Sequence, residues 1–141
     1  MLVENWMTRR VASVKPLDSL QHAREVQEAH RINQLPVVSG AELVGIVTDR
    51  DVRDAFPSVF DFAATGESHR PTSATDPKKI AVESVMTGNV CTIGPEETIF
   101  AAAKLMGERR IGAMPVVSGG KLVGILTRSD LLRALVALGA K

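Results

Sequence analysis

The sequence has few of the residues on which several classes of site depend. It contains one cysteine, Cys91, and no tyrosine, with four phenylalanines and one tryptophan. A single cysteine cannot form an intramolecular disulfide or, alone, a zinc site, so we expect a reducing, cytoplasmic compartment. The scarcity of aromatic rings argues against a platform that stacks single-stranded nucleic acid.

An excess of charge of either sign is also missing. The 17 lysines and arginines nearly balance the 16 aspartates and glutamates, which gives a net charge of +1. No bulk electrostatic attraction therefore favours nucleic acid or a membrane surface. The longest apolar runs are far shorter than the roughly 20 residues of a membrane span. Residues 1–7 lack the basic and apolar stretches of a secretory signal. We expect no membrane and no nucleic-acid partner.

Motifs for catalysis and metal binding are absent as well. The sequence contains no Gly-rich phosphate loop, no metal-ligand cluster and no nucleophile motif. None of His22, His30 and His69 is near Cys91 in sequence. Ala12 takes the place of Cys91 in the other half of the chain, which favours a buried, inert thiol. We therefore predict that the protein is not an enzyme and has no catalytic residue, no metal and no required cofactor.

What the chain does contain is an internal repeat with a constant shift of 79 residues. Residues 3–56 lie over residues 82–135 without a gap, and 21 of these 54 pairs are identical. Such identity exceeds chance, so the chain is two copies of one supersecondary unit. The predicted organisation is repeat 1 at residues 1–56, a linker at 57–81 and repeat 2 at 82–141. The linker is expected to be mobile, with a short helical turn near Phe60 and Phe62.

Each copy begins with a predicted strand and helix. The strands are expected at residues 11–14 and 90–93. Ser19 and Thr98 are expected to be the N-caps of the following helices, because a hydroxyl there accepts from unpaired backbone amides. Apolar residues recur at helical spacing after each cap.

A strand pair and a closing helix complete each copy. Turns at residues 39–40 and 118–120 separate apolar strands. The closing helices are predicted over residues 52–56, ending at Pro57, and over residues 131–138. The order β-α-β-β-α, present twice, indicates an α+β fold of mixed α/β type. Because a unit of about 55 residues is marginal alone, we expect the repeats to pack as a pseudo-twofold intramolecular dimer.

Three motifs recur in the same order in both copies. They are residues 3–8 and 82–87, residues 32–38 and 111–117, and the Gly-x-x-Thr-x-x-Asp runs 45–51 and 124–130. The pattern resembles the CBS domain, named for cystathionine β-synthase, which works in tandem pairs called Bateman modules. The resemblance covers both repeats and implies a stand-alone CBS domain-containing protein. It implies a sensor that binds an adenosyl ligand, namely AMP, ADP, ATP or S-adenosylmethionine, in clefts between the repeats and signals to a partner by conformational change.

Two interpretations apply to the Thr-x-x-Asp pattern, at Thr48 and Asp51 and again at Thr127 and Asp130. An Asp carboxylate only accepts hydrogen bonds and can take both hydroxyls of a ribose, while the Thr hydroxyl can point at the same sugar or at a phosphate. The same residue types also cap helices. We assign ribose and phosphate binding to these four residues, and capping is an alternative that does not exclude it.

By resemblance, each cleft takes residues from both repeats. One cleft combines Thr127 and Asp130 with Ile32, Asn33, Gln34, Pro36 and the loop from Thr8 to Val11. The other combines Thr48 and Asp51 with Ile111, Gly112, Ala113, Pro115 and the loop from Thr87 to Val90. The isoleucines and prolines would form apolar walls for adenine. Because Gly45 and Gly124 lack a Cβ, a flat base is expected to approach their strands closely.

Phosphate has no evident basic partner in this scheme. Some nucleotide-binding members of the family place a basic pair after the first isoleucine of the second motif, where this chain has Asn33-Gln34 and Gly112-Ala113. Phosphate contacts would then come from arginines that are otherwise solvated surface residues: Arg9, Arg10, Arg31, Arg50, Arg110 or Arg128. The missing pair leaves room for a weakly charged adenosyl ligand, and the two sites need not be equivalent.

The alternative to a sensor is a protein-interaction or dimerisation module without a functional ligand site. The last helix carries more apolar positions than one packed stripe needs. These positions are Leu131, Leu132, Leu135, Val136 and Leu138. We predict that this helix contributes to a homodimer interface, whereas the sequence does not identify a protein target.

Overall fold

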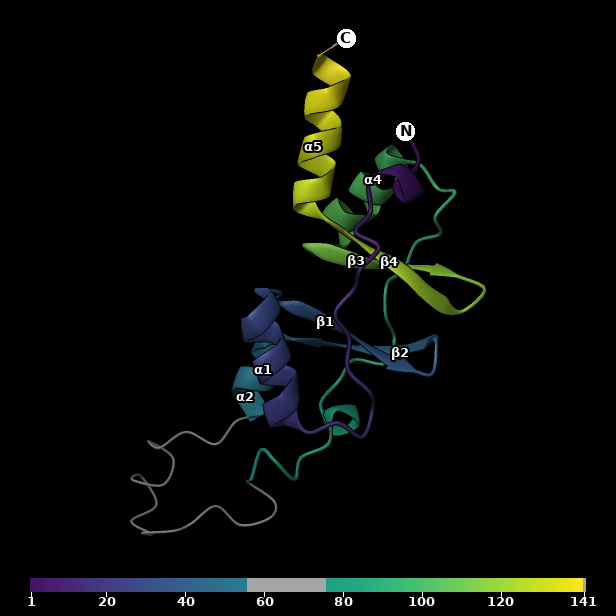
Figure 1. The fold of residues 1–141 in the computed structure, drawn as a ribbon. Coiled ribbons are helices and arrows are strands. Elements are labelled where there is room, and N and C mark those ends of the chain that lie inside the picture. Colours follow the sequence, from purple (N-terminus) through teal and green to yellow (C-terminus); the bar gives the residue numbers. More distant parts are fainter. Residues whose placement is uncertain (56–75, 141) are drawn as a thin grey trace. The chain divides into compact units, whose positions relative to one another are not determined.

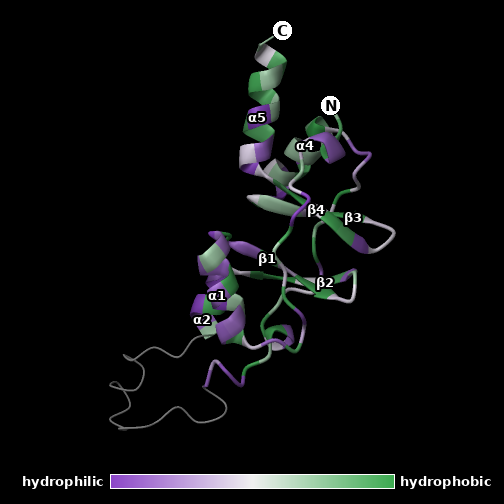
Figure 2. Cartoon of the chain, in the orientation of Figure 1, coloured by the Kyte–Doolittle hydropathy of each residue, from purple (hydrophilic) through white to green (hydrophobic). Residues whose placement is uncertain are grey.

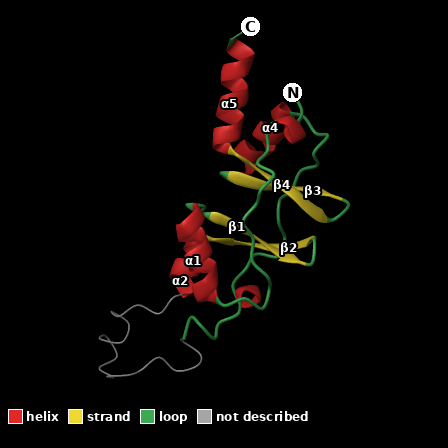
Figure 3. Cartoon of the chain, in the orientation of Figure 1, coloured by secondary structure: helices red, strands yellow, loops and turns green. Residues whose placement is uncertain are grey.

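The structure, a computed structural model, describes residues 1–55 and 76–140 and divides into two compact units (Figure 1). The N-terminal unit contains residues 12–39 and 44–89, and the C-terminal unit contains residues 1–11, 40–43 and 90–141. Each unit combines helices with antiparallel strands (Figure 3), which confirms the mixed α/β fold class.

The N-terminal unit is built around a strand pair and two helices. Its elements are α1 (Leu20–His30), β1 (Gln34–Ser39), β2 (Glu42–Thr48, whose first residues belong to the other unit), α2 (Asp49–Ala55) and the 3-10 helix η2 (Val82–Ser84). Helix α1 packs against β1 and α2. The run from Leu35 to Val37 is buried, as expected for a strand covered on both faces.

The C-terminal unit repeats this plan. Its elements are the 3-10 helix η1 (Val3–Asn5), α4 (Ile99–Arg109), β3 (Ala113–Ser118), β4 (Lys121–Thr127) and α5 (Arg128–Gly139). Strands β3 and β4 form an antiparallel hairpin in which Ala113 lies opposite Thr127, with a bulge between Val116 and Val117. At the other edge of β4, Lys121 pairs with Glu42. This register places Thr127 at the open end of the hairpin, where α5 begins.

The helix starts follow the predicted capping residues. The Ser19 hydroxyl accepts from the His22 amide at 3.1 Å, and the Thr98 hydroxyl accepts from the Ala101 amide at 3.0 Å. Both predictions of an N-cap are therefore confirmed. The predicted apolar faces are also inside, because Leu20 and Ala23 of α1 and Ile99, Ala102 and Met106 of α4 are buried.

The segment at the start of each repeat packs into the core of the other repeat. We call residues 1–8 and 80–87 the leading segments. Val3 is 0% exposed and belongs to the core cluster of the C-terminal unit, together with Met106, Met114 and Leu126. The Val3 amide donates to the Glu97 carbonyl at 2.8 Å. The first leading segment is therefore a structural part of the C-terminal unit.

The second leading segment repeats this arrangement in the N-terminal unit. Val82 is 0% exposed in a cluster that includes Leu20, Leu35 and Val47. Its amide donates to the Asp18 carbonyl at 2.8 Å. In both units the leading segment also accepts from the first amide of a helix: Leu20 donates to Ile80 at 2.8 Å, and Ile99 donates to Met1 at 3.0 Å. These bonds satisfy donors that a helix cannot satisfy internally.

The prediction of a strand at the start of each copy is wrong. Residues 11–14 and 90–93 make only single parallel bridges, from Val14 to Val37 and from Ile93 to Val116. The pairing stops because a proline follows two residues later in each copy, and proline has no amide hydrogen to extend a ladder.

The closing helices begin three residues earlier than predicted, at Asp49 and Arg128. They begin earlier because the Thr of Thr-x-x-Asp is the capping residue itself, so the rest of the motif forms the first helical turn. The predicted helix end at Phe56 and Pro57 lies outside the described residues, as does the turn expected near Phe60 and Phe62.

Two smaller expectations also change. Cys91 is half-buried rather than buried, and its thiol lies 3.7 Å from the sulfur of Met114 at the edge of the core. The last residues of the predicted linker are anchored in the N-terminal unit, because Gln21 donates to the Pro77 carbonyl at 3.1 Å and Leu20 donates to Ile80. The repeat boundaries drawn from the sequence stay a prediction.

Candidate ligand-binding half-sites

The first Thr-x-x-Asp closes a hydrogen-bonded ring at the junction of β2 and α2. The Thr48 amide donates to Asp51 Oδ2 at 2.9 Å, and the Asp51 amide donates to Thr48 Oγ1 at 3.0 Å. Thr48 and Asp51 are both half-buried. Among residues 1–55 and 76–140, none donates a hydrogen bond to Asp51 Oδ1 or forms an ion pair with it. One carboxylate oxygen therefore fixes the turn, and the other is available to a hydroxyl donor. We call Thr48 and Asp51 the first half-site.

The second Thr-x-x-Asp has the same ring but a more engaged carboxylate. The Thr127 amide donates to Asp130 Oδ2 at 2.8 Å, and the Asp130 amide donates to Thr127 Oγ1 at 3.3 Å. Asp130 is only 3% exposed, and its Oδ1 accepts from Arg133. The Arg133 side chain also reaches the Trp6 carbonyl, at 3.5 Å. We call Thr127 and Asp130 the second half-site.

Both Thr-x-x-Asp motifs therefore cap a helix. The reciprocal bonds at each motif form a capping box, with Asp in the position that Glu or Gln often takes. Capping does not consume the ligand-binding capacity of Asp51, whose second oxygen remains. At Asp130 both oxygens already accept hydrogen bonds, and a ribose would have to use the remaining lone pairs.

The leading segments bring the predicted threonines to the half-sites. Thr8 pairs with Ile125 through two bonds of 2.9 Å, and Thr87 pairs with Ile46 in the same way. Ile125 and Ile46 each lie two residues before a half-site threonine. Thr8 therefore lies beside the second half-site and Thr87 beside the first, as the resemblance implied for these two loop residues.

The expectation that a base approaches Gly45 and Gly124 is contradicted. A Cβ on Gly124 would lie 2.6 Å from the sulfur of Met7 and 3.0 Å from the Thr8 carbonyl. A Cβ on Gly45 would lie 2.5 Å from the sulfur of Met86. The space beside each glycine is filled by a methionine of a leading segment, so these glycines admit protein rather than ligand.

The residues after α1 and α4 turn back toward the half-sites. Arg31 and Arg110 end these helices with φ of 53° and 55°, in the left-handed region that glycine usually occupies. Two residues after each of these arginines, a backbone carbonyl accepts a hydrogen bond from the first amide of the closing helix. Asp49 donates to Asn33 at 2.7 Å, and Arg128 donates to Gly112 at 3.1 Å.

The other predicted pocket residues fall into two groups. Pro36 and Pro115 are fully buried, and their carbonyls accept from Val14 and Ile93. The remaining apolar and polar pocket residues are accessible. Asn33 is exposed, and the others are half-buried: Val11, Ile32, Gln34, Val90, Ile111, Gly112 and Ala113. Of these groups, the second offers accessible surface to a base. Their assembly into clefts that mix the two repeats stays a prediction.

The candidate phosphate-binding arginines are all exposed. Arg9, directly after the first leading segment, donates to the Glu4 carbonyl of that segment at 3.1 Å. Arg128 differs from the others because its guanidinium lies 3.5 Å from the point that a Cβ on Gly112 would occupy. It therefore covers the position where Gly112 has no side chain of its own.

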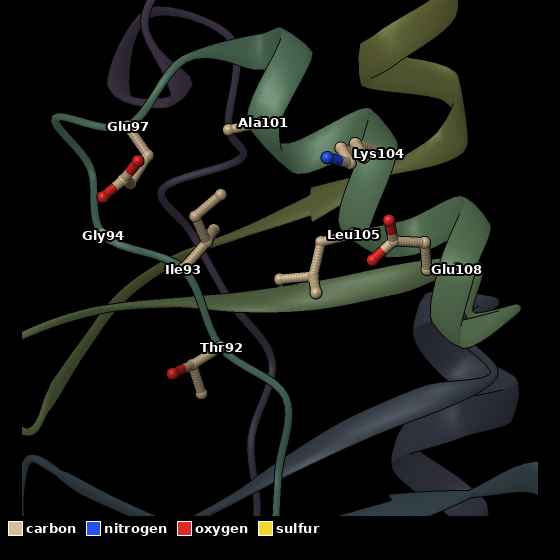
Figure 4. Close-up of a pocket in the computed structure, with 8 residues that line it drawn as sticks. All are labelled: Thr92, Ile93, Gly94, Glu97, Ala101, Lys104, Leu105 and Glu108. Atoms are coloured by element: carbon tan, nitrogen blue, oxygen red, sulfur yellow. The ribbon is translucent and has the colours of Figure 1, made fainter.

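A groove in the C-terminal unit lies away from these motifs (Figure 4). It has a volume of about 420 Å³, with Ile93 and Leu105 between the polar side chains of Glu97, Lys104 and Glu108. None of the predicted site residues lines it. Across the described part of the chain, no three His, Cys, Asp or Glu side chains gather as metal ligands, and no helix could span a membrane.

Three residues that shape the half-sites were not predicted from the sequence. Gln27 is buried in α1 and donates to the Val47 carbonyl at 3.4 Å, which holds the end of β2 beside Thr48. Arg133 donates a hydrogen bond to Asp130 Oδ1, and Met7 fills the space beside Gly124. A polar residue on the apolar face of α1 was a visible signal for Gln27. The other two required knowledge of the packing.

Comparisons with known proteins identify a family for the chain. The CBS domain family matches residues 3–58 and 82–137. A CBS domain-containing protein of Dictyostelium discoideum is 35% identical over 138 residues, which cover 96% of this chain and 92% of that protein. An inosine-5′-monophosphate dehydrogenase of Korarchaeum cryptofilum is 37% identical over 129 residues; the match covers 91% of this chain and spans only 23% of the enzyme.

Solved structures of similar fold contain adenosyl compounds. CBSX2 from Arabidopsis thaliana in complex with AMP has a TM-score of 0.79 and 27% identity, with 98% of both chains covered. The CBS domain pair of protein MJ0100, in complex with 5′-methylthioadenosine and S-adenosylmethionine, has a TM-score of 0.74 and 27% identity, with 100% of this chain and 98% of that chain covered. The family match spans both repeats, and this chain therefore belongs to the CBS domain family as a tandem pair.

Proposed function

We propose that the chain is a regulatory module that binds an adenosyl ligand through its two Thr-x-x-Asp half-sites. The ligand is AMP, ADP, ATP or S-adenosylmethionine, held in clefts to which both repeats contribute. The observation that carries this proposal is the Asp51 carboxylate, which is fixed through Oδ2 while Oδ1 faces no described partner. The AMP, 5′-methylthioadenosine and S-adenosylmethionine named for similar structures support the ligand class.

The capping ring prepares the carboxylate for a sugar. Asp51 cannot rotate freely, because its Oδ2 accepts from the Thr48 amide at 2.9 Å. When a ribose hydroxyl donates a hydrogen bond to Oδ1, the protein therefore loses little conformational entropy. Charge-assisted hydrogen bonds of this kind are stronger than those between neutral groups. Thr48 Oγ1 already accepts from the Asp51 amide, so its hydroxyl hydrogen remains for the sugar or a phosphate oxygen.

The exchange of leading segments offers a route for a signal. Thr8 and Thr87 lie beside the strands that end in the half-sites, and each belongs to the repeat opposite in sequence. A ligand that contacts a half-site and its neighbouring threonine touches chain from both repeats. Such a ligand shifts a conformational equilibrium only if its affinity differs between two arrangements. We propose that this difference is read by a partner protein in the cytoplasm, without catalysis and without a cofactor.

We expect adenosyl ligands to raise the melting temperature of the chain. A ligand at 100 times its dissociation constant stabilises the folded state by about 2.7 kcal/mol. The decisive variant is Asp51→Asn, because the amide oxygen of Asn can keep the capping bond while the NH2 group cannot accept from a ribose hydroxyl. The measurement is a thermal-shift series with AMP, ATP and S-adenosylmethionine.

Glu83→Gln is the matched control, since Glu83 is exposed in the same unit and also loses one negative charge. The proposal predicts that Asp51→Asn reduces the shift caused by the ligand and Glu83→Gln does not. A wild-type chain whose melting temperature does not respond to any of the three ligands would remove the basis for a sensor.

A second candidate function is a dimerisation module, favoured by the surface of α5. Leu132, Leu135 and Val136 are 62%, 64% and 72% exposed. Ala134, which lies between them in sequence, is 1% exposed. Figure 2 shows hydrophobic residues along α5 up to its C-terminal end. The surplus of apolar positions predicted from the sequence is therefore confirmed, and the homodimer stays a proposal.

Sedimentation tests this candidate. We expect a dimer at micromolar concentration and a monomer after Leu135→Glu, because a charge in a desolvated apolar contact is costly. Leu17→Glu is the control, since Leu17 is 79% exposed but lies outside α5. A wild-type chain that sediments as a monomer would exclude α5 as a homodimer surface. Both candidate functions can hold together, because the half-sites and the exposed residues of α5 are different residues.

A further inference from the structure

The two half-sites carry opposite charge at matching positions. The shift of 79 residues places Asp49 in the N-terminal unit where the C-terminal unit has Arg128. Both residues are exposed and each begins its closing helix directly after the half-site threonine. One helical turn later, Arg133 accompanies Asp130, whereas its counterpart beside Asp51 is Asp54. Arg50 and Arg53 also lie on α2, opposite the uncharged Ser129 and Leu132. With three aspartates and two arginines, residues 49–54 carry a net charge of −1, whereas two arginines and one aspartate give residues 128–133 a net charge of +1.

Asp49 and Arg128 occupy equivalent positions of the backbone. The Asp49 amide donates to the Asn33 carbonyl at 2.7 Å, and the Arg128 amide donates to the Gly112 carbonyl at 3.1 Å. In the C-terminal unit the missing side chain of Gly112 leaves room for the guanidinium, which lies 3.5 Å from the Cβ position. A cation thus covers the turn next to the second half-site, while the first half-site has an aspartate at the matching backbone position.

The two half-site carboxylates also differ in whether a cation neutralises them. Asp130 is paired with Arg133, so the second half-site presents Arg128 with little opposing negative charge. No cation among the described residues pairs with Asp51, and the aspartates of α2 outnumber its two arginines, Arg50 and Arg53. An anion close to the first half-site would be repelled, and an anion close to the second would be attracted.

We propose that the half-sites sort adenosyl compounds by the charge at the 5′ position of the ribose. The second half-site takes a compound with a 5′-phosphate, such as AMP, through Arg128. The first half-site takes an uncharged or cationic compound, such as 5′-methylthioadenosine or S-adenosylmethionine. This inference rests on the proposed function and adds the ligand class of each half-site. It makes Arg128 the phosphate contact among the arginines and Asp49 the residue that rejects phosphate.

Calorimetric titration of the full chain tests the sorting with AMP and 5′-methylthioadenosine, which share adenosine and differ in charge at the 5′ position. The quantity of interest is the ratio of the two affinities. Hydrogen bonds to charged groups are strong enough that Arg128→Ala should lower the preference for AMP about tenfold. Asp49→Asn should raise it by removing repulsion. Arg109→Ala is the control, since Arg109 is an exposed arginine of the same unit at the end of α4.

The outcomes separate the inference from the function on which it rests. A ratio that falls in Arg128→Ala, rises in Asp49→Asn and is unchanged in Arg109→Ala supports the sorting. Binding of both compounds with a ratio that neither Arg128→Ala nor Asp49→Asn alters overturns the sorting and leaves the adenosyl sensor intact. Binding of neither compound, nor of S-adenosylmethionine, to the wild-type chain overturns the proposed function and the sorting together. Because Arg128 and Asp49 are exposed, neither substitution disturbs a core.

Discussion

A Val3→Asp substitution should unfold the C-terminal unit, although residue 3 belongs by sequence to the first repeat. Val3 is 0% exposed and packs with Met106, Met114 and Leu126. An unpaired carboxylate in this cluster should lower the free energy of unfolding by about 3 kcal/mol or more. Hydrogen exchange followed by mass spectrometry should therefore show lost protection over residues 99–139, with less effect in α1 and β1.

Leu17→Asp is the control for this experiment. It introduces the same charge near the same end of the chain, but Leu17 is 79% exposed. Surface substitutions of this kind usually change stability by no more than about 0.5 kcal/mol. If Val3→Asp instead lost protection mainly over residues 12–55, the leading segment would belong to its own repeat and the exchange of segments described above would be wrong.

A Gly124→Val substitution should destabilise the chain by about 3 kcal/mol through overpacking. The Cβ alone would lie 2.6 Å from the Met7 sulfur and 3.0 Å from the Thr8 carbonyl. The thioether can swing aside, but the carbonyl is backbone and is held by the Ile125 amide at 2.9 Å. Urea denaturation of the variant measures the loss.

A double-mutant cycle identifies the cause. Met7→Ala removes the side chain that meets the new Cβ, so Gly124→Val should cost less in that background, by about 1 kcal/mol or more. Gly88→Val serves as the control, because a Cβ at Gly88 would meet no atom within 4 Å. Additive losses for Met7→Ala and Gly124→Val would show that the two residues do not compete for the same space.

Much of the fold could be predicted because its signals are local. Ser19 and Thr98 each precede an apolar pattern of helical period, and a side-chain hydroxyl at that point can satisfy backbone amides whatever the rest of the chain does. The repeat and the half-site residues were also visible, since Thr-x-x-Asp recurs at a constant shift. The prediction of the first strands was wrong because a segment that makes one bridge before a proline shows the same apolar pattern as a short strand.

The exchange of leading segments could not be predicted from the repeat. Val3 and Val82 occupy equivalent positions in two nearly identical packing arrangements, so the pattern is the same whether each segment packs on its own copy or on the other. For the same reason Gly45 and Gly124 suggested room for a ligand, when the room belongs to Met86 and Met7. The pairing of Arg133 with Asp130 likewise depends on burial that sequence spacing does not show.

Amide NMR spectra of the isotope-labelled chain, titrated with AMP and with S-adenosylmethionine, test whether the two half-sites bind adenosyl compounds. Backbone amides report where a ligand binds, independently of whether it stabilises the fold. Binding at the half-sites predicts saturable shifts that cluster at residues 46–52 and 125–131, where the capping rings join strands to helices. In Asp51→Asn these shifts should fade at residue 51. Shifts confined to the groove around Ile93 and Leu105, or no shifts with either compound, would contradict binding at the half-sites.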